Sequence, residues 1–257
     1  MLHNLLGTYK EYLQGLYSKD TAATYSKRLS ALFSGQPIID TADRLDIEKL
    51  LKRLSELKYK NDFSQAKNAF LHFCEFQNIN LPNDVMRRIR ELEKQTRKKY
   101  RKLEPVEYVA VDRKIKSIRN KKLKLSYQVM GVAGFRVSEL ADITAKGCTV
   151  SDNEIAFSFR AKGGKKEVVT LSALEYPKLY QSIKALIENT PPEKKLFYSA
   201  AHLQKKATEL GFKCHDLRRI FAKLEYKKSK SKIKVMEKLR HSNMKNTNIY
   251  LRSKVKF

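Results

Sequence analysis

The sequence predicts a mainly α-helical protein with a small β-sheet or hairpin, made of an N-terminal helical bundle followed by an α+β domain. Apolar residues recur at three- and four-residue steps through residues 4–93, which is typical of amphipathic helices. Residues 154–160 instead alternate between apolar and polar side chains and precede a glycine turn, as one strand of a hairpin does. The chain has 257 residues, and at ~150 residues per domain we expect two domains.

The pattern of apolar residues over 1–93 predicts a bundle of four or five helices. Polar or helix-breaking segments at 34–37, 60–62 and 78–83 separate the helical stretches. Tyrosine and phenylalanine side chains lie on the apolar stripes, and we interpret them as core residues rather than as a ligand site. The apolar positions are Tyr9, Leu13 and Leu16; Tyr25, Leu29 and Leu32; Leu50, Leu54 and Leu57; Phe63, Ala66, Phe70 and Phe73; and Val85, Ile89 and Leu92.

The charge of the chain indicates a polyanionic partner. There are 54 Lys and Arg residues against 27 Asp and Glu, which is a net charge of +27. Such an excess is most often found in proteins that bind nucleic acid, where the neutralised phosphates release their counterions. A highly soluble, lysine-rich protein without such a partner is the alternative.

Other features of the composition favour the cytoplasm. No run of about 18 apolar residues could span a membrane, and the N-terminal residues lack the zones of a signal peptide. The three cysteines, Cys74, Cys148 and Cys214, are widely separated and form no CxxC pair. We therefore expect neither a disulfide framework nor a zinc ribbon.

Residues 94–105 predict a basic linker between the two domains. Residues 94–102 read KQTRKKYRK, with six basic side chains in nine positions, and Pro105 follows. A segment of this kind is suited to lie along a phosphate backbone, and the alternative is a solvated helix end. The side chains expected to contact DNA are Arg97, Lys98, Lys99, Arg101 and Lys102.

Residues 106–257 combine helices with a hairpin. A helix is expected at 121–133, and strands are expected at 154–160 and 168–171. The turn between the strands, at 161–165, holds two glycines flanked by lysines. Further helices are expected at 174–188, 200–210, 215–226, 232–240 and 243–251.

The sequence lacks the common motifs of metal- and nucleotide-dependent enzymes. It has no GxxxxGK[ST] loop, no HExxH helix and no cluster of aspartates. Cys214, His215 and Asp216 are adjacent in the chain, and adjacent side chains rarely converge on one ion. We therefore expect no metal site.

Three short strings are the candidates for chemistry. They are GFRVSEL at 134–140, HDLRRIFA at 215–222 and LRHSNMKNTNIY at 239–250. His241 and Tyr250, both in the third string, are nine residues apart. In this order, and with a lysine-bearing hairpin between the first two strings, the set resembles the signature of the tyrosine recombinase family, which includes the phage-type integrases.

The resemblance covers roughly residues 106–250 by motif and the preceding residues by architecture. It implies that residues 1–93 form a helical core-binding domain and that residues 106–257 form the catalytic domain. It also implies that the two domains act as a C-shaped clamp on DNA.

Each matched residue has a chemical reason to be there. Arg136 and Arg218 would grip the nonbridging oxygens of a phosphodiester, because guanidinium groups suit phosphate geometry. Tyr250 would be the nucleophile, and a phenol with a pKa of about 10 needs help in losing its proton. His215 is the natural acid/base partner, because imidazole titrates near neutral pH. Alone, Tyr250 could be a packing residue, but its spacing from His241 favours the nucleophile.

The resemblance assigns roles to four further residues. His241 would hydrogen-bond the phosphate, and Glu139 would brace the site three residues beyond Arg136. The family uses a hairpin lysine to protonate the leaving 5′ oxygen, and Lys162 matches best, with Lys165 second; an ordinary turn lysine is the alternative for Lys162. No metal, nucleotide or other cofactor is implied, because the phosphotyrosine bond conserves the energy of the diester.

The chain departs from the family pattern at two positions. Arg240 stands where the third motif usually has glycine, and Arg219 stands where the second often has a further histidine. Neither change removes a catalytic group, but Arg240 bears on the local backbone geometry.

The function implied is that of a site-specific DNA recombinase or integrase, as used by mobile elements, that cleaves and rejoins strands through a 3′-phosphotyrosyl intermediate and a Holliday junction. The expected partners are double-stranded DNA with a specific recombination site and three further copies of the chain on synapsed DNA. The free protein is expected to be a monomer, cytoplasmic and associated with the nucleoid. Alternatives are a type IB topoisomerase-like nick-and-reseal enzyme, a non-catalytic DNA-binding protein that kept the fold, and a basic RNA-binding protein, for which no RNP-type or GXXG motif is present.

Overall fold

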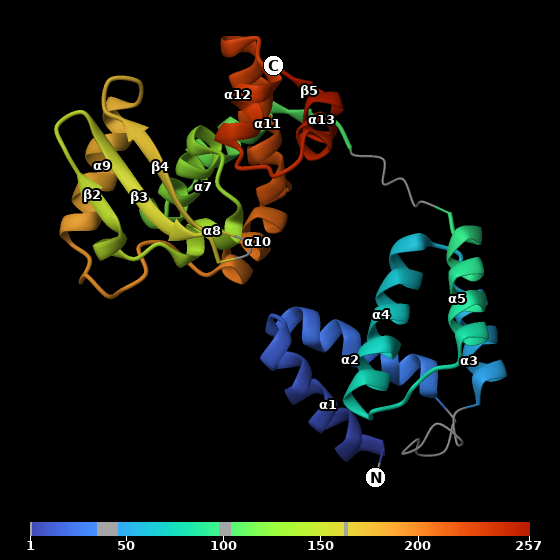
Figure 1. Ribbon diagram of the computed structural model, residues 1–257. Helices are drawn as coiled ribbons and strands as arrows, with labels where there is room; N and C mark the ends of the chain where they lie inside the picture. Colours follow the sequence, from blue (N-terminus) through green and yellow to red (C-terminus); the bar gives the residue numbers. More distant parts are fainter. Residues whose placement is uncertain (1, 35–45, 98–103, 162–163) are drawn as a thin grey trace. The chain divides into compact units, whose positions relative to one another are not determined.

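The protein divides into two compact units, residues 1–102 and residues 103–257, each with its own hydrophobic core (Figure 1). The computed structural model describes residues 2–34, 46–97, 104–161 and 164–257. The fold is mainly helical with small sheets in the second unit, which confirms the predicted fold class. Over the described ranges, no helix has the length and apolar character needed to cross a membrane.

The described part of the N-terminal unit consists of helices. Tyr9 and Phe63 are fully buried in its core, which confirms that the aromatic stripes are packing residues. The Tyr9 hydroxyl donates to the backbone oxygen of Ala69 at 2.6 Å, so the polar end of this buried ring is satisfied. The helices are α1 (Leu2–Leu16), α2 (Lys19–Phe33), α3 (Ile47–Ser55), α4 (Lys60–Phe76) and α5 (Asn83–Gln95).

The chain after α5 returns to the start of α4. The Arg97 amide donates to the Lys58 oxygen at 2.9 Å, and the Lys60 amide donates to the Arg97 oxygen at 2.9 Å. Arg97, predicted as the first DNA-contacting residue of the linker, is therefore held by its backbone against the N-terminal unit. The other residues predicted to contact DNA lie outside the described residues: Lys98, Lys99, Arg101 and Lys102.

The C-terminal unit contains an antiparallel sheet in the order β2-β3-β4 and a two-stranded parallel pair, β1-β5. The predicted hairpin is β3 and β4, in which Phe157 faces Val169. The elements are β1 (Val106–Glu107), α6 (Tyr108–Lys116), α7 (Lys121–Ala133), α8 (Val137–Asp142), the 3-10 helix η2 (Ala145–Gly147), β2 (Cys148–Val150), β3 (Glu154–Arg160), β4 (Lys166–Ser172), α9 (Pro177–Glu188), α10 (Ala200–Glu209), α11 (Cys214–Ser229), α12 (Lys232–Lys238), α13 (Met244–Arg252) and β5 (Val255–Lys256).

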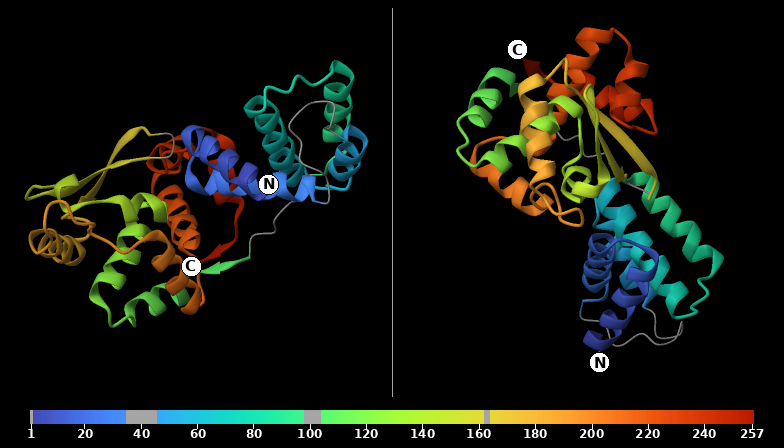
Figure 2. Two further views of the ribbon diagram at one scale, coloured as in Figure 1. Left: turned by 90° about the horizontal axis from the view of Figure 1, so that it is seen from below. Right: turned by 90° about the vertical axis from the view of Figure 1, so that its left-hand side faces the viewer.

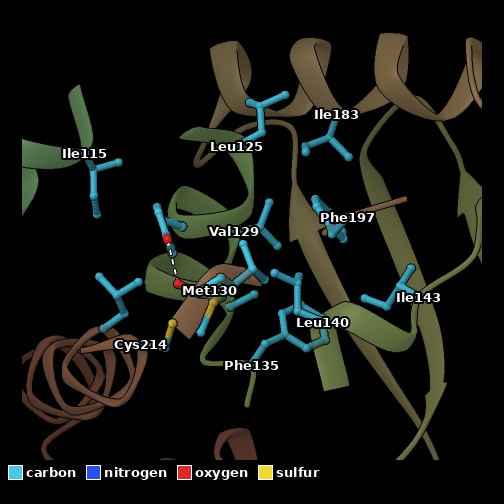
Figure 3. Packing of buried hydrophobic residues seen from close by; sticks show 14 of the residues in the cluster. Ile115, Leu125, Val129, Met130, Phe135, Leu140, Ile143, Ile183, Phe197 and Cys214 are labelled. Atoms are coloured by element: carbon cyan, nitrogen blue, oxygen red, sulfur yellow. Dashed lines mark hydrogen bonds between the residues drawn. The ribbon is translucent and has the colours of Figure 1, made fainter. Parts of the chain in front are cut away.

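The sheet and the helices share one core. The inward side chains of β3 are buried, as its alternating pattern predicts, and α9 packs on β3 and β4. Phe135, in the first motif, packs edge-on against Phe157 and Phe159 of β3, with ring centroids 5.8 Å and 5.3 Å away. Figure 3 shows Phe135 and Leu140 packed beside Met130 of α7. The first motif is therefore anchored between α7 and the sheet.

Helix α7 lies between the sheet and α11, and α12 and α13 pack on α11 and on each other (Figures 1 and 2). A second, smaller apolar cluster joins these three helices and includes Phe221, Leu239 and Tyr250. The chain after α13 forms β5, and Val255 pairs in parallel with Val106 of β1. The last three helices thus share an apolar cluster of their own and carry two of the three motifs, while α11 also joins the main core.

Gly134→Ala is expected to destabilise the protein by about 2–4 kcal/mol, because Gly134 has a φ of 64° and an added Cβ would lie 2.5 Å from Cδ1 of Phe221. Gly131→Ala is the matched control in the same helix, since a Cβ there would meet nothing within 4 Å. The control is expected to gain up to ~1 kcal/mol from helix propensity. Urea unfolding followed by circular dichroism measures both, and equal midpoints for the two variants would contradict the packing argument.

Candidate active site

Four elements bring together the five residues that the motifs singled out. Arg136 is the N-cap of α8, His215 and Arg218 lie on α11, and Tyr250 is in the last turn of α13. His241 lies in the turn between α12 and α13. The Tyr250 ring lies between the two imidazoles, with centroid distances of 5.3 Å to His215 and 5.2 Å to His241.

A direct polar contact within this cluster joins the side chains of Tyr250 and His215. The hydroxyl oxygen of Tyr250 lies 2.6 Å from Nε2 of His215. Desolvation, followed by the charge of Arg218, lowers the pKa of His215, although the residue as a whole is exposed. Burial raises the pKa of Tyr250, and Arg218 offsets this only in part. Near neutral pH the tyrosine is therefore protonated and donates to a neutral imidazole.

The start of α11 explains why His215 and Arg218 share this position. Asp216, at the third position of the helix, accepts the Lys213 amide at 2.9 Å and so caps the first turn. His215 follows the first helical residue, and Arg218 is three residues further on, on the same face of the helix. The HxxR spacing thus aims both side chains at one point.

Arg218 is a buried cation without a close carboxylate. Its side chain is 1% exposed and donates to the backbone oxygens of Gly134 and Leu239. The nearest oxygen of Glu139 is 4.0 Å away, and Nε of Arg218 has no partner among the described residues. Burial, then Arg136, lowers the pKa of Arg218 to about 10, which leaves the group charged near neutrality. A buried charge of this kind is stabilised by an anion, so the site is suited to bind one.

Glu139 compensates part of this charge. Its side chain is 3% exposed, accepts the backbone amide of Arg136 at 2.8 Å through Oε2 and pairs with the Arg136 guanidinium through Oε1. Burial raises the pKa of Glu139, but the Arg136 amide and the charge of Arg240 outweigh it and leave the pKa below its usual value. The glutamate of the first motif is therefore an ionised cap of α8 that holds Arg136.

Arg240 adopts the left-handed conformation at the end of α12, with a φ of 53°. The His241 amide donates to the Met236 oxygen at 3.0 Å, and the Arg240 amide donates to the Glu237 oxygen at 2.8 Å. These two bonds form a Schellman motif, whose left-handed position is usually glycine. The arginine therefore keeps the backbone that a glycine would adopt, and its side chain pairs with Oε2 of Glu139 at 2.8 Å.

His241 is held by a residue that the motifs did not single out. Its Nδ1 lies 3.0 Å from Oγ1 of Thr247, which is fully buried. Burial, then Arg218 and Arg136, lowers the pKa of His241 to about 4, so the imidazole is neutral near pH 7. The signal in the sequence is position: Thr247 lies three residues before Tyr250, on the same face of α13.

The charges of the site leave an excess of two positive units, since three guanidinium groups face one carboxylate. The guanidinium groups are those of Arg136, Arg218 and Arg240, and the carboxylate is Glu139. Arg219, the second departure from the family pattern, is instead paired with Asp216 at 3.0 Å. The site can therefore stabilise a doubly charged anion without a metal ion.

A cavity of about 300 Å³ opens beside Arg136 and His215. Cys214 lies on its wall, and burial raises the pKa of this thiol to about 11, so the residue is a protonated packing group. Within the described ranges, no group of three or more His, Cys, Asp or Glu side chains could hold a metal ion.

The two hairpin lysines differ in what the structure describes. Lys162, the predicted proton donor, lies outside the described residues. Lys165 is 78% exposed near the turn between β3 and β4, and its Nζ lies 3.4 Å from Glu167. An ion pair this exposed restrains the lysine little.

Comparisons with known proteins identify the family of the chain and similar folds. The profile described as "Phage integrase family" matches residues 101–256. The fold is similar to that of a lambda integrase dimer bound to a COC′ core site, at a TM-score of 0.62 and 18% identity over 96% of this chain and 94% of that one. It is also similar to the XerH site-specific recombinase bound to difH substrate, at a TM-score of 0.61 and 18% identity over 89% of this chain and 74% of that one.

A third similar structure is the Tn1549 transposon integrase in complex with circular intermediate DNA, at a TM-score of 0.58 and 15% identity over 96% of this chain and 94% of that one. At these identities the likeness concerns the fold. No curated protein matches the sequence at a significant level.

Thr247→Val is expected to change the tautomer of His241, because it removes the hydroxyl that lies 3.0 Å from Nδ1. With the hydroxyl donating to Nδ1, the wild-type imidazole carries its proton on Nε2 only, whereas the valine variant populates both tautomers. Imidazole nitrogen shifts in NMR spectra measure this. Thr247→Ser keeps the hydroxyl and serves as the control, and a wild-type proton on Nδ1 would contradict the assignment.

Proposed function

Because the chain belongs to the phage integrase family, we propose that it is a site-specific DNA recombinase that cleaves and rejoins strands through a covalent 3′-phosphotyrosyl intermediate. The observation that supports this most directly is the 2.6 Å contact between the Tyr250 hydroxyl and Nε2 of His215, next to the buried Arg218, whose nearest carboxylate oxygen among the described residues is 4.0 Å away. A nucleophile, its proton acceptor and an anion site thus lie together.

In the cleavage step, the Tyr250 oxygen forms a bond to the scissile phosphorus while the bond to the 5′ oxygen breaks. The phenolic proton passes to Nε2 of His215, which is available because the pKa of this imidazole is lowered and its neutral form dominates. The phosphate stays attached to Tyr250 through its 3′ side. The strand is then resealed when a 5′ hydroxyl attacks the phosphotyrosine, so no outside energy source is consumed.

Arg136 and Arg218 stabilise the charge that develops on the nonbridging oxygens. The transition state of the diester gains negative charge in a site whose excess positive charge is already in place, so little reorganisation is needed. His241, neutral and oriented by Thr247, donates its other ring N–H to the same phosphate. Arg218 contributes most to the stabilisation of this charge, because its buried guanidinium lacks a close anionic partner among the described residues.

The leaving 5′ oxygen needs a proton, and a hairpin lysine supplies it. We assign this role to Lys162, with Lys165 as the alternative. An ammonium donor is compatible with a site that uses neither metal nor cofactor, since one proton transfer completes the balance of the step.

The partner is double-stranded DNA that carries a specific recombination site, in keeping with the net charge of +27. The N-terminal unit acts as the core-binding domain, and the basic segment 94–105 follows the phosphate backbone. Exchange proceeds through a Holliday junction in a four-protomer assembly; a lambda integrase tetramer bound to a Holliday junction has a similar fold, at a TM-score of 0.59. The free protein is a monomer that works in the cytoplasm, at the nucleoid.

Tyr250→Phe is expected to bind DNA like the wild type and to lose covalent adduct by more than ~1,000-fold, because the nucleophilic oxygen is gone. The measurement is detergent trapping of protease-sensitive DNA–protein adducts on genomic DNA of the source organism. Tyr226→Phe is the matched control, since Tyr226 packs against the same small apolar cluster outside the site.

Equal adduct from Tyr250→Phe and the wild type would refute the assignment of Tyr250. Relaxation of supercoiled DNA without exchange between two sites would favour the nick-and-reseal alternative. Tight, salt-sensitive binding of the genomic DNA without any adduct would favour a non-catalytic DNA-binding protein.

Lys162→Ala is expected to slow cleavage of ordinary DNA by about 10²- to 10⁴-fold, as loss of a general acid does. A substrate whose leaving 5′ oxygen is replaced by sulfur should restore the rate, because a thiolate leaves without a proton. The measurement is the initial rate of adduct formation on both substrates. Lys165→Ala is tested in parallel, and rescue of that variant instead would move the role to Lys165.

A further inference from the structure

We propose that Arg240 is a positioning residue for strand cleavage: it occupies the carboxylate of Glu139 and thereby keeps Arg218 free to bind the phosphate. The inference rests on the proposed function, because it concerns how the same site receives its substrate. Arg240 itself does not touch DNA in this proposal. Its side chain is 7% exposed and points into the protein.

Arg240 and Arg218 face the same carboxylate oxygen. Nη2 of Arg240 donates to Oε2 of Glu139 at 2.8 Å, whereas Nη1 of Arg218 is 4.0 Å from this oxygen. The other oxygen, Oε1, is paired with Arg136. If Arg240 were absent, Arg218 would be a cation 4.0 Å from Oε2 that is not yet paired with this carboxylate, and the attraction between opposite charges is strong in a buried site. A close Arg218–Glu139 pair would then compete with phosphate binding.

Other contacts hold the Arg240 guanidinium beside the carboxylate of Glu139. Nη1 donates to the Lys238 oxygen at 2.9 Å, and Nη2 also reaches the Gly134 oxygen at 3.2 Å. The guanidinium lies over the rings of Phe135 and Phe159, at 5.5 Å and 5.4 Å from their centroids. The Gly134 oxygen is shared with Arg218, so the two arginines are fixed relative to each other.

The left-handed backbone at Arg240 indicates that the contacts of its side chain compensate for an unfavourable conformation. A φ of 53° disfavours every residue with a Cβ, and glycine would adopt it without strain. The arginine is therefore placed where the backbone favours glycine, and its five polar and aromatic contacts offset the strain. This allows a substitution that removes the side chain while it relieves the backbone.

Arg240→Gly is the informative variant, and Lys230→Gly is its matched control. Among the described residues of the C-terminal unit, Lys230 is the other non-glycine residue with a positive φ, at 52°, and its side chain is exposed. Both substitutions remove the strain of a positive φ at a residue with a Cβ, but only Arg240→Gly also removes a side-chain contact to the site. Arg240→Gly should form adduct about 10- to 100-fold more slowly than the wild type, with DNA affinity within about twofold. Lys230→Gly should cleave like the wild type.

A double variant tests whether Arg240 acts through Glu139. In a Glu139→Gln background the neutral amide no longer attracts Arg218, so the further change Arg240→Gly should slow adduct formation by less than about threefold. Low-millimolar guanidinium ion should partly restore Arg240→Gly by filling the space over the aromatic rings, whereas urea at the same concentration should not. Full additivity of the two substitutions would overturn the proposal.

A readout without DNA separates this proposal from the proposed function. Arginine side-chain NMR spectra of the free protein should show that the Arg218 signal shifts in Arg240→Gly and stays in place in Lys230→Gly. An unchanged Arg218 signal would overturn the role of Arg240, whatever the protein does to DNA. A shifted signal in a protein whose wild type forms no adduct would support the role of Arg240 and refute the proposed function alone.

Discussion

The buried guanidinium of Arg218 is the constraint on which the rest of the site depends. It donates to the backbone oxygens of Gly134 and Leu239, which lie at the C-terminal ends of α7 and α12. Carbonyl groups at helix C-termini carry partial negative charge, and each such end stabilises a nearby cation by about 0.3–1 kcal/mol. Both helices end in a left-handed residue, Gly134 or Arg240, and so these carbonyl groups are turned toward the arginine.

The carbonyl dipoles at the ends of α7 and α12 compensate the charge of Arg218 less completely than a carboxylate would. The remaining charge affects the pKa values of the neighbouring groups. The remaining positive charge lowers the pKa of both His215 and His241, after desolvation, and keeps both imidazoles neutral. A neutral His215 can accept the proton of Tyr250. The same positive charge would favour a phenolate at Tyr250, so the proposed anion-binding group also assists the proposed nucleophile.

The contact between Tyr250 and His215 depends on how α13 is held against α11. Lys223 of α11 donates to the backbone oxygen of Leu251, and Arg219 of the same helix donates to the oxygen of Glu104 at 2.9 Å, beside the β1-β5 pair. The Ser253 hydroxyl donates to the backbone oxygen of Tyr250 at 2.5 Å and so caps the end of α13. The proposed nucleophile and its proton acceptor therefore lie on two helices that a bond from Lys223 to the end of α13 joins directly.

The sequence by itself determined the helical class, the hairpin and the choice of candidate residues for the chemistry, because periodicity, glycine turns and motif spacing are local properties. His215 and Arg218 are one helical turn apart in any helix, and Glu139 caps any helix that begins after Arg136. The short strands β1, β2 and β5 were not predicted, since two or three residues carry no periodic signal. Tertiary structure alone decided the contacts of Arg240. They depend on charges and carbonyl groups that come from distant segments, such as Glu139 beside Arg240, and meet only when α7, α8, α11 and α12 pack together.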